Sequence, residues 1–395
     1  MENLVVVAAI AAVAPLLASA FGRWIAIPLV VFEIVLGILF GPQVLGWVEP
    51  GPQIEFLSQF GLAMLFLLAG YEIDFARIRG RPLRQSAIGW LLSLALGVGL
   101  GVLLSPTVAA GVLVGICLTS TALGTLLPVL RDSDELSTPF GAAMLAVGAV
   151  GEFGPLIAVA LFLSGRSPLR AAVILIVFAL LIVAALVVTV RFEHARVHRL
   201  IEATLHTSGQ FAVRLVILIL AALVALATSF GLDMLLGAFG AGVLINLLLA
   251  GADPQAARVI ETKLDAVGFG FLVPIFFVNT GLGFDLDALT EKASTMALVP
   301  IFALLFLVVR GIPATLAAPP GSSWYDRGAI VLLGATGLPI IVAVTTIGVD
   351  HGDLRTSTAA ALVGAGIFSV LLYPLLGLTL RRRFKGPSPA DSVPA

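Results

Sequence analysis

The chain has 395 residues, of which 59% are hydrophobic and 11% are charged, and its formal net charge is −1. Soluble domains carry about 25% charged residues, so this composition excludes an ordinary soluble protein. The near-neutral charge also argues against a nucleic-acid partner, which would require a basic surface. Repeated apolar runs of about eighteen residues or more instead predict an all-α polytopic membrane protein embedded in a lipid bilayer.

Thirteen apolar segments can each cross a bilayer, and we expect all of them to be membrane helices. The first lacks the basic start of a cleavable signal peptide, so we interpret it as a retained span. The expected spans are approximately 3–20, 25–45, 54–72, 85–104, 108–130, 138–164, 169–190, 211–229, 232–250, 264–283, 294–312, 327–348 and 356–380. They form a single membrane domain over residues 1–380. The basic, Pro/Ser-rich tail 381–395 is expected to be a disordered cytoplasmic tail.

The distribution of lysine and arginine predicts the orientation. With the N-terminus outside, sixteen of the 22 basic residues lie in cytoplasmic loops and four lie in external loops. Cytoplasmic loops carry an excess of basic residues, so this distribution supports both the number of spans and their direction. We therefore expect a multi-pass protein of the cytoplasmic (inner) membrane with a cytoplasmic C-terminus. The longest polar connection, 191–208, is expected to form a short helix on the cytoplasmic face.

Two spans are interrupted at their centres. The segment 108–130 contains the polar run Thr119–Thr121, and the segment 327–348 contains the glycine-rich run Gly334–Gly337; a proline follows each run. Glycine and proline weaken a helix, and broken backbone at this depth survives only when buried in protein or facing water. The two spans cross in opposite directions and lie seven spans apart, which indicates inverted repeats and an alternating-access transporter. The alternative is that glycine and proline are merely common in membrane helices.

An isolated acid, Glu152, lies about midway along the apolar span 138–164. An ionised carboxylate at that depth costs about 3 kcal/mol on insertion scales, so it must be protonated, paired or hydrated. The same oxygens, once deprotonated, suit a hard monovalent cation. A group that holds either a proton or a cation, but never both, is the minimum requirement for exchange. The alternative is a neutral acid that is hydrogen-bonded within the bundle.

Other deep polar residues have more than one interpretation. Arg310 can be a structural anchor that extends its guanidinium to the interface, or the charge partner of a buried acid. Glu33 can line an aqueous funnel or bond to a neighbouring helix, and Asn279 can coordinate an ion or bridge two helices. The hydroxyl and acid candidates for ion or proton binding are Glu152, Thr119, Ser120, Thr121 and Thr336.

Motifs for other functions are missing from the sequence. It contains no phosphate-binding loop, no dinucleotide fingerprint and no nucleophile paired with a base, so we expect neither an enzyme nor a cofactor. The four histidines are too scattered to form a metal site. A transported monovalent cation is the only metal that we expect.

Four segments, in this order, resemble those of one known family. They are IPLVVFEIVLGILFGPQVLG (27–46), FGLAMLFLLAGYEIDF (60–75), LTSTALGTLLPVL (118–130) and PIFFVNTGLGFDL (274–286). The chain resembles the monovalent cation:proton antiporter-2 family, which includes bacterial Na+/H+ antiporters and the glutathione-gated K+ efflux systems. The similarity extends over about residues 3–380.

The resemblance implies thirteen helices, a homodimer and an elevator movement of a core past a dimerisation domain. It implies a dimerisation subdomain at about 1–72 and 169–263, and a core subdomain at about 85–164 and 264–380. It also places the ion site on the helix after the first broken one, where members carry a pair such as Asn-Asp or Asp-Asp. The matching pair here is Gly151-Glu152, which lacks the first polar group and adds a methylene to the second.

The combined prediction is a secondary transporter that exchanges Na+ or K+ for H+, with a role in pH homeostasis. One titratable acid favours one-for-one electroneutral exchange. A Na+-coupled symporter of the same fold is one alternative, although it would need a roomier polar cavity. A membrane sensor or partner subunit without transport is the other alternative, because Gly151 contributes no polar group.

Overall fold

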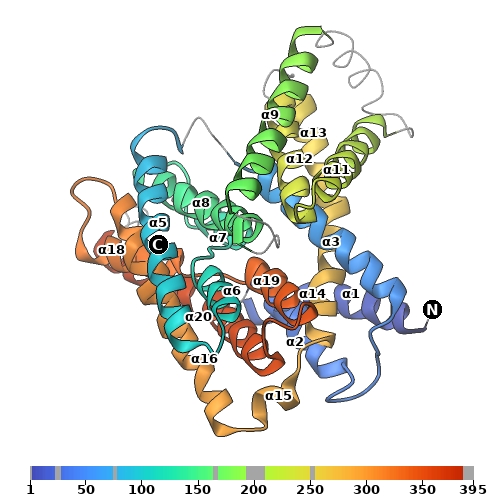
Figure 1. Ribbon diagram of the computed structural model, residues 1–395, viewed down its shortest axis with the longest axis vertical. Coiled ribbons are helices and arrows are strands. Elements are labelled where there is room, and N and C mark those ends of the chain that lie inside the picture. Colours follow the sequence, from blue (N-terminus) through green and yellow to red (C-terminus); the bar gives the residue numbers. More distant parts are fainter. Residues whose placement is uncertain are drawn as a thin grey trace, which may run out of the picture. The chain divides into compact units, whose positions relative to one another are not determined.

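The computed structural model describes residues 2–22, 28–73, 78–162, 168–192, 210–249 and 254–385. Within these ranges the regular elements are all helical, which confirms the all-α prediction (Figure 1). Among the described residues, ten helices are long and apolar enough to cross a membrane, and three shorter apolar helices account for the remaining expected spans. Most of the expected surface helix 191–208 and most of the tail 381–395 lie outside the described ranges, because residues 193–209 and 386–395 are not among them. Residues 381–385 extend the last helix rather than starting the tail.

The helices divide into two units by their contacts. Unit 1 comprises residues 1–19, 32–73 and 156–284, and unit 2 comprises residues 20–31, 74–155 and 285–395. Residues 264–283, which we expected in the core subdomain, therefore contact the helices of unit 1.

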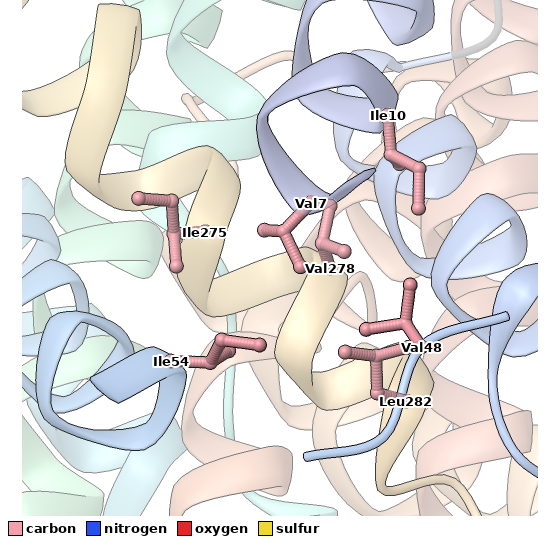
Figure 2. Close-up of a cluster of buried hydrophobic side chains, with 7 residues drawn as sticks. All are labelled: Val7, Ile10, Val48, Ile54, Ile275, Val278 and Leu282. Atoms are coloured by element: carbon pink, nitrogen blue, oxygen red, sulfur yellow. The ribbon is translucent and has the colours of Figure 1, made fainter. Parts of the chain in front are cut away.

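The helices that lie mainly in unit 1 are α1 (Glu2–Gly22), α2 (Leu29–Phe40), α3 (Pro52–Tyr71), α9 (Pro168–Phe192), α11 (Phe211–Ser229), α12 (Met234–Leu249), α13 (Pro254–Val267), the π-helical η1 (Gly268–Leu272) and α14 (Val273–Leu282). Within this unit α3 packs against both α12 and α14. Figure 2 shows part of its core, where Val7 of α1, Ile54 of α3 and Val278 of α14 come together with other buried aliphatic side chains. The apolar faces of these helices are buried against one another.

The helices that lie mainly in unit 2 are α5 (Arg81–Leu104), α6 (Val108–Leu118), α7 (Leu123–Asp132), α8 (Pro139–Phe162), α15 (Leu286–Thr290), α16 (Ala293–Leu305), the π-helical η2 (Phe306–Gly311), α17 (Ile312–Ala314), the 3₁₀ turn η3 (Thr315–Ala317), α18 (Trp324–Gly334), α19 (Pro339–Asp350) and α20 (Thr356–Lys385). In this unit α5 packs against α6 and η2, and α20 packs against α16, α18 and α19.

Both predicted interruptions are present, as α6–α7 and α18–α19, and Figure 1 shows each pair as separate helices. The first break lies at residues 119–122 and the second at residues 335–338. Pro128 does not cause the first break, because it lies inside α7. The run of hydroxyl residues is therefore the better sequence signal, since such side chains offer backbone groups alternative hydrogen-bond partners.

The tenth span begins earlier than expected. The sequence predicted a helix over 264–283, whereas a continuous helical segment starts at Pro254 and reaches Leu282 through η1. The additional turns carry Arg258, Glu261 and Lys263, which interrupt the apolar run. Hydropathy detects the part of a helix that is apolar on every side, so the amphipathic beginning of α13 was missed.

A charged cluster connects three helix ends in unit 2. The Arg381 guanidinium on α20 donates two hydrogen bonds of 3.2 Å to the carboxylate of Glu135, in the α7–α8 connection. It also donates to the carboxylate of Asp326 at the start of α18 and lies 4.1 Å from the centre of the Phe140 ring. Asp326 in turn forms a reciprocal capping box with Ser323. One arginine thus supplies positive charge to two largely buried acids.

Replacing Arg381 with Ala should destabilise the protein by about 2–3 kcal/mol, because removal of one partner leaves buried charge behind and partial exposure reduces the penalty. Thermal unfolding of the detergent-solubilised chain measures this change. The control is Arg327→Ala, because Arg327 directly follows Asp326 in α18 but is exposed, and its loss should change stability by about 0.5 kcal/mol or less. Equal shifts for the two variants would contradict the role of the cluster.

Candidate functional site

The two broken helices meet at their interruptions. The backbone N–H of Ala122 donates to the carbonyl of Thr336 over 2.8 Å. The Thr121 hydroxyl donates to the carbonyl of Gly334, the last residue of α18, over 2.6 Å. Residues more than two hundred positions apart are thus joined by both main-chain and side-chain hydrogen bonds. Polar groups that a continuous helix would satisfy internally are satisfied here between the two breaks.

The helix α8 holds the first break in place. Its Gly151 carbonyl accepts a 3.0 Å hydrogen bond from the backbone N–H of Thr121. Its Glu152 carboxylate accepts a 3.1 Å hydrogen bond, at Oε2, from the backbone N–H of Leu123, the first residue of α7. Two consecutive residues of α8 therefore contact the break through different groups.

The Glu152 carboxylate is positioned to interact with the N-terminus of α7. The side chain is 2% exposed, and the N-cap residue of α7 is Ala122, which has no side-chain acceptor of its own. A helix N-terminus presents free N–H groups and a partial positive charge, both of which favour an anion. The carboxylate therefore takes the place of the missing side-chain cap of α7.

Arg310 is fully buried in unit 2. Its Nε donates to the Thr121 hydroxyl over 2.7 Å, and its Nη2 donates to the Val147 carbonyl of α8 over 2.7 Å. The same Thr121 hydroxyl donates to Gly334, so the arginine is linked through it to the C-terminal end of α18. A helix C-terminus carries partial negative charge and favours a cation. Of the two interpretations from sequence, the interfacial anchor is excluded by this burial.

The chain around Arg310 departs from α-helical geometry. The residue lies in η2, a π-helical segment that is followed by Pro313. Proline has no N–H to donate to the carbonyl four residues earlier, so an α-helical hydrogen bond is lost at this point. Single π-helical turns within α-helices frequently occur at functional sites.

The space beside Gly151 is occupied by the Arg310–Thr121 pair. A Cβ atom at position 151 would lie 2.5 Å from Nη2 of Arg310, 2.5 Å from Oγ1 of Thr121 and 2.6 Å from its Cβ. Non-bonded carbon atoms prefer separations of about 3.5–4.0 Å, so no side chain fits at this position. The guanidinium and the threonine side chain thus give a steric reason for a glycine at position 151.

The remaining hydroxyl candidates line the breaks but bond mainly to their own helices. Thr119 donates to Ile116, Ser120 donates to Cys117, and Thr336 donates to Leu332. Sequence reasoning missed Ser369 of α20, whose hydroxyl accepts from the Gly337 N–H at the second break and donates to the Gly366 carbonyl of its own helix. The signal for Ser369 was a single hydroxyl residue in the apolar stretch 359–372.

The other two candidates lie in unit 1. Asn279 of α14 donates from Nδ2 to the Ser58 hydroxyl of α3 over 3.2 Å, which is the helix-bridging interpretation. Its Oδ1 is buried and has no hydrogen-bond partner in the described part of the chain. Glu33 of α2 is also buried. Glu152, Arg310 and Thr121 are therefore assembled within unit 2, and Asn279 and Glu33 belong to unit 1.

Comparison with known proteins agrees with this architecture. The profile of the family described as sodium/hydrogen exchanger, transmembrane, matches residues 8–378. The Bacillus subtilis protein YjbQ is 28% identical over all of this chain, which spans 65% of YjbQ. An Enterococcus hirae Na(+)/H(+) antiporter is 23% identical, with 92% of this chain and 94% of that protein covered.

The fold is that of a solved antiporter. The structure of the sodium proton antiporter MjNhaP1 from Methanocaldococcus jannaschii matches with a TM-score of 0.65 at 18% identity, and 98% of each chain is covered. The fold prediction, which includes the two broken helices, is thereby confirmed. With a family match over nearly its whole length, this multi-pass membrane protein belongs to the transmembrane sodium/hydrogen exchanger family.

Proposed function

We propose that the chain is a secondary active transporter that exchanges Na+ or K+ for H+ by alternating access. The observation that carries the proposal is the buried Glu152 carboxylate, which is held at the N-terminus of α7 where two broken helices meet. The antiporter relatives favour exchange over the symporter and the non-transporting subunit. The protein would act in the cytoplasmic membrane, with its N-terminus outside, and would serve pH homeostasis.

Glu152 would carry the proton and the cation in alternation. Protonated, it is neutral and compatible with its apolar surroundings; deprotonated, it offers oxygen ligands to a dehydrated cation. The hydroxyls of Thr119, Ser120, Thr121 and Thr336 would supply further oxygens as the breaks adjust. The site then has the same net charge in both loaded forms. Exchange with one such acid is therefore one-for-one and electroneutral.

The positive charge of Arg310 would set the electrostatic potential at the Glu152 carboxylate. Its guanidinium stays charged and occupies the space next to Gly151, one residue before the acid. A positive charge near the site disfavours a bound cation unless the carboxylate is ionised. This arrangement would couple cation entry to proton release.

We also propose that the protein is a homodimer and that unit 2 moves as the elevator core. Asn279 and Glu33 of unit 1 would be lesser contributors to an ion path.

Purified protein in liposomes with an imposed pH gradient tests the function. Added Na+ or K+ should dissipate the gradient, and clamping the membrane potential with valinomycin and K+ in a parallel Na+ experiment should leave the rate unchanged, because exchange is electroneutral. A panel from Li+ to Cs+ identifies the transported ion. Failure of every alkali cation would favour the non-transporting subunit. Movement of Na+ that requires an organic anion would favour the symporter.

A further inference from the structure

Three buried polar atoms of unit 2 have no hydrogen-bond partner in the described part of the chain. They are Ser86 Oγ and Trp90 Nε1 on α5, and Arg310 Nη1 on η2. Ser86 and Arg310 are fully buried, and Trp90 is 7% exposed. Buried polar groups are nearly always paired, with protein or with ordered water, because leaving one unpaired is costly. Three exceptions on two contacting segments require a shared explanation.

The three residues are connected through α5 and α8. Ser86 and Trp90 are one turn apart on the same face of α5, with Cβ atoms about 5–6 Å apart. Trp90 packs on α8 at Gly154, where a Cβ atom would lie 2.6 Å from Cζ2 of the indole. Arg310 packs on the same helix at Gly151, one turn earlier. The indole and the guanidinium are therefore neighbours on one face of α8.

Other buried hydroxyls in unit 2 behave differently. Ser93, also on α5 and equally buried, donates to the Gly89 carbonyl over 3.0 Å. Thr345 and Ser369 likewise donate to carbonyls of their own helices. A serine in a helix readily makes such a bond. Because the Ser86 hydroxyl makes none within the described part of the chain, we infer that it bonds to a molecule that is not part of the protein.

We propose that Ser86, Trp90 and Arg310 bind an internal water cluster that fixes the position of the Arg310 guanidinium. Trp90 and Arg310 contribute donors and Ser86 contributes a hydroxyl, which is the set that a small number of waters satisfies. The cluster begins about 8 Å from the cytoplasmic start of α5 at Arg81. Ser86 and Trp90 are positioning residues, which act on Glu152 through water and Arg310.

The proposal rests on the proposed function, because the effect of a misplaced guanidinium is measured as a change in the kinetics of cation exchange. Without the water contacts, the guanidinium is free to shift toward the Glu152 carboxylate and to compete with the cation. Loss of one such hydrogen bond should raise the apparent KM for the cation about fivefold while the maximal rate stays near that of the wild type. A purely structural role would instead lower the maximal rate and the unfolding temperature together.

Trp90→Phe and Ser86→Ala test the predicted rise in KM in proteoliposomes, because each substitution removes the polar atom and keeps most of the side-chain volume. Ser93→Ala is the matched control, because it removes a hydroxyl that is already paired, and its KM should not change. An unchanged KM in both Trp90→Phe and Ser86→Ala would overturn the proposal. So would an equal rise in the Ser93→Ala control.

Thiol oxidation tests the water site without transport. Ser86→Cys and Ser93→Cys are each made in a Cys117→Ala background, because Cys117 is the only native cysteine. Hydrogen peroxide, which is close to water in size and can exchange with internal water, should oxidise Ser86→Cys to the sulfenic acid about tenfold faster than Ser93→Cys, since hydration favours the reactive thiolate. Equal rates would overturn the proposal. If the wild type exchanges no alkali cation, the proposed function fails, and this difference in oxidation rate alone decides whether the water site exists.

Discussion

Replacing Glu152 with Gln should reduce cation:proton exchange to the level of empty liposomes. The amide has nearly the same shape as the carboxyl, and its oxygen can still accept the hydrogen bond from Leu123 that the carboxylate accepts in the structure. It has no proton to release and no negative charge to offer a cation. The variant thus separates the chemistry of the acid from its structural role, and dissipation of an imposed pH gradient by Na+ or K+ is the measurement.

Companion variants make the result specific. Glu152→Asp keeps the carboxylate but shortens its reach, so exchange should persist at a reduced rate. Glu152→Ala removes the α7 cap as well, and should cost a further 0.5–2 kcal/mol or so of stability. Glu55→Gln removes an exposed acid from the first turn of α3 and should exchange like the wild type. Full activity in Glu152→Gln would remove this residue from the mechanism.

The sequence predicted those features of the fold that depend on residues close together in the chain. Apolar length predicted the spans, and the polar run at Thr119–Thr121 and the glycines around Thr336 predicted both breaks. The beginning of α13 was missed because its charged face hides the helix from a hydropathy window. The break after α6 was correctly placed, but Pro128 had no part in it. A membrane helix tolerates proline when neighbouring groups satisfy the freed carbonyl.

The assembly of the site depended on contacts that the sequence does not contain. Whether Arg310 reached the interface or the core was decided by packing against Thr121, which is 189 positions away. Gly151 was interpreted as the loss of a polar group, because a pairwise comparison of residues cannot show what fills the space. In the structure, the guanidinium of an arginine on η2 and the Thr121 side chain occupy the space next to Gly151.

Any side chain at position 151 should therefore disrupt the site while leaving Glu152 intact. Gly151→Ala places a Cβ within 2.5 Å of both Arg310 Nη2 and Thr121 Oγ1, and neither group can retreat without breaking a buried hydrogen bond. Overpacking of this kind typically costs about 1–3 kcal/mol. We expect a lower unfolding temperature in detergent and strongly reduced exchange. Gly99→Ala on α5 is the control, because its Cβ meets nothing within 4 Å.

Gly151→Asn sharpens the argument, because it restores a polar residue before the acid. If position 151 simply lacks a ligand, this variant should gain activity; if the guanidinium occupies the space, it should be worse than Gly151→Ala. In the second case, Arg310→Ala should vacate room for the amide, so the double variant should be more stable than the sum of the single effects by about 0.5–3 kcal/mol. Thermal unfolding of the four proteins measures this coupling. Additive effects would show that Gly151 and Arg310 are independent, and the steric explanation of the Gly151-Glu152 pair would then be wrong.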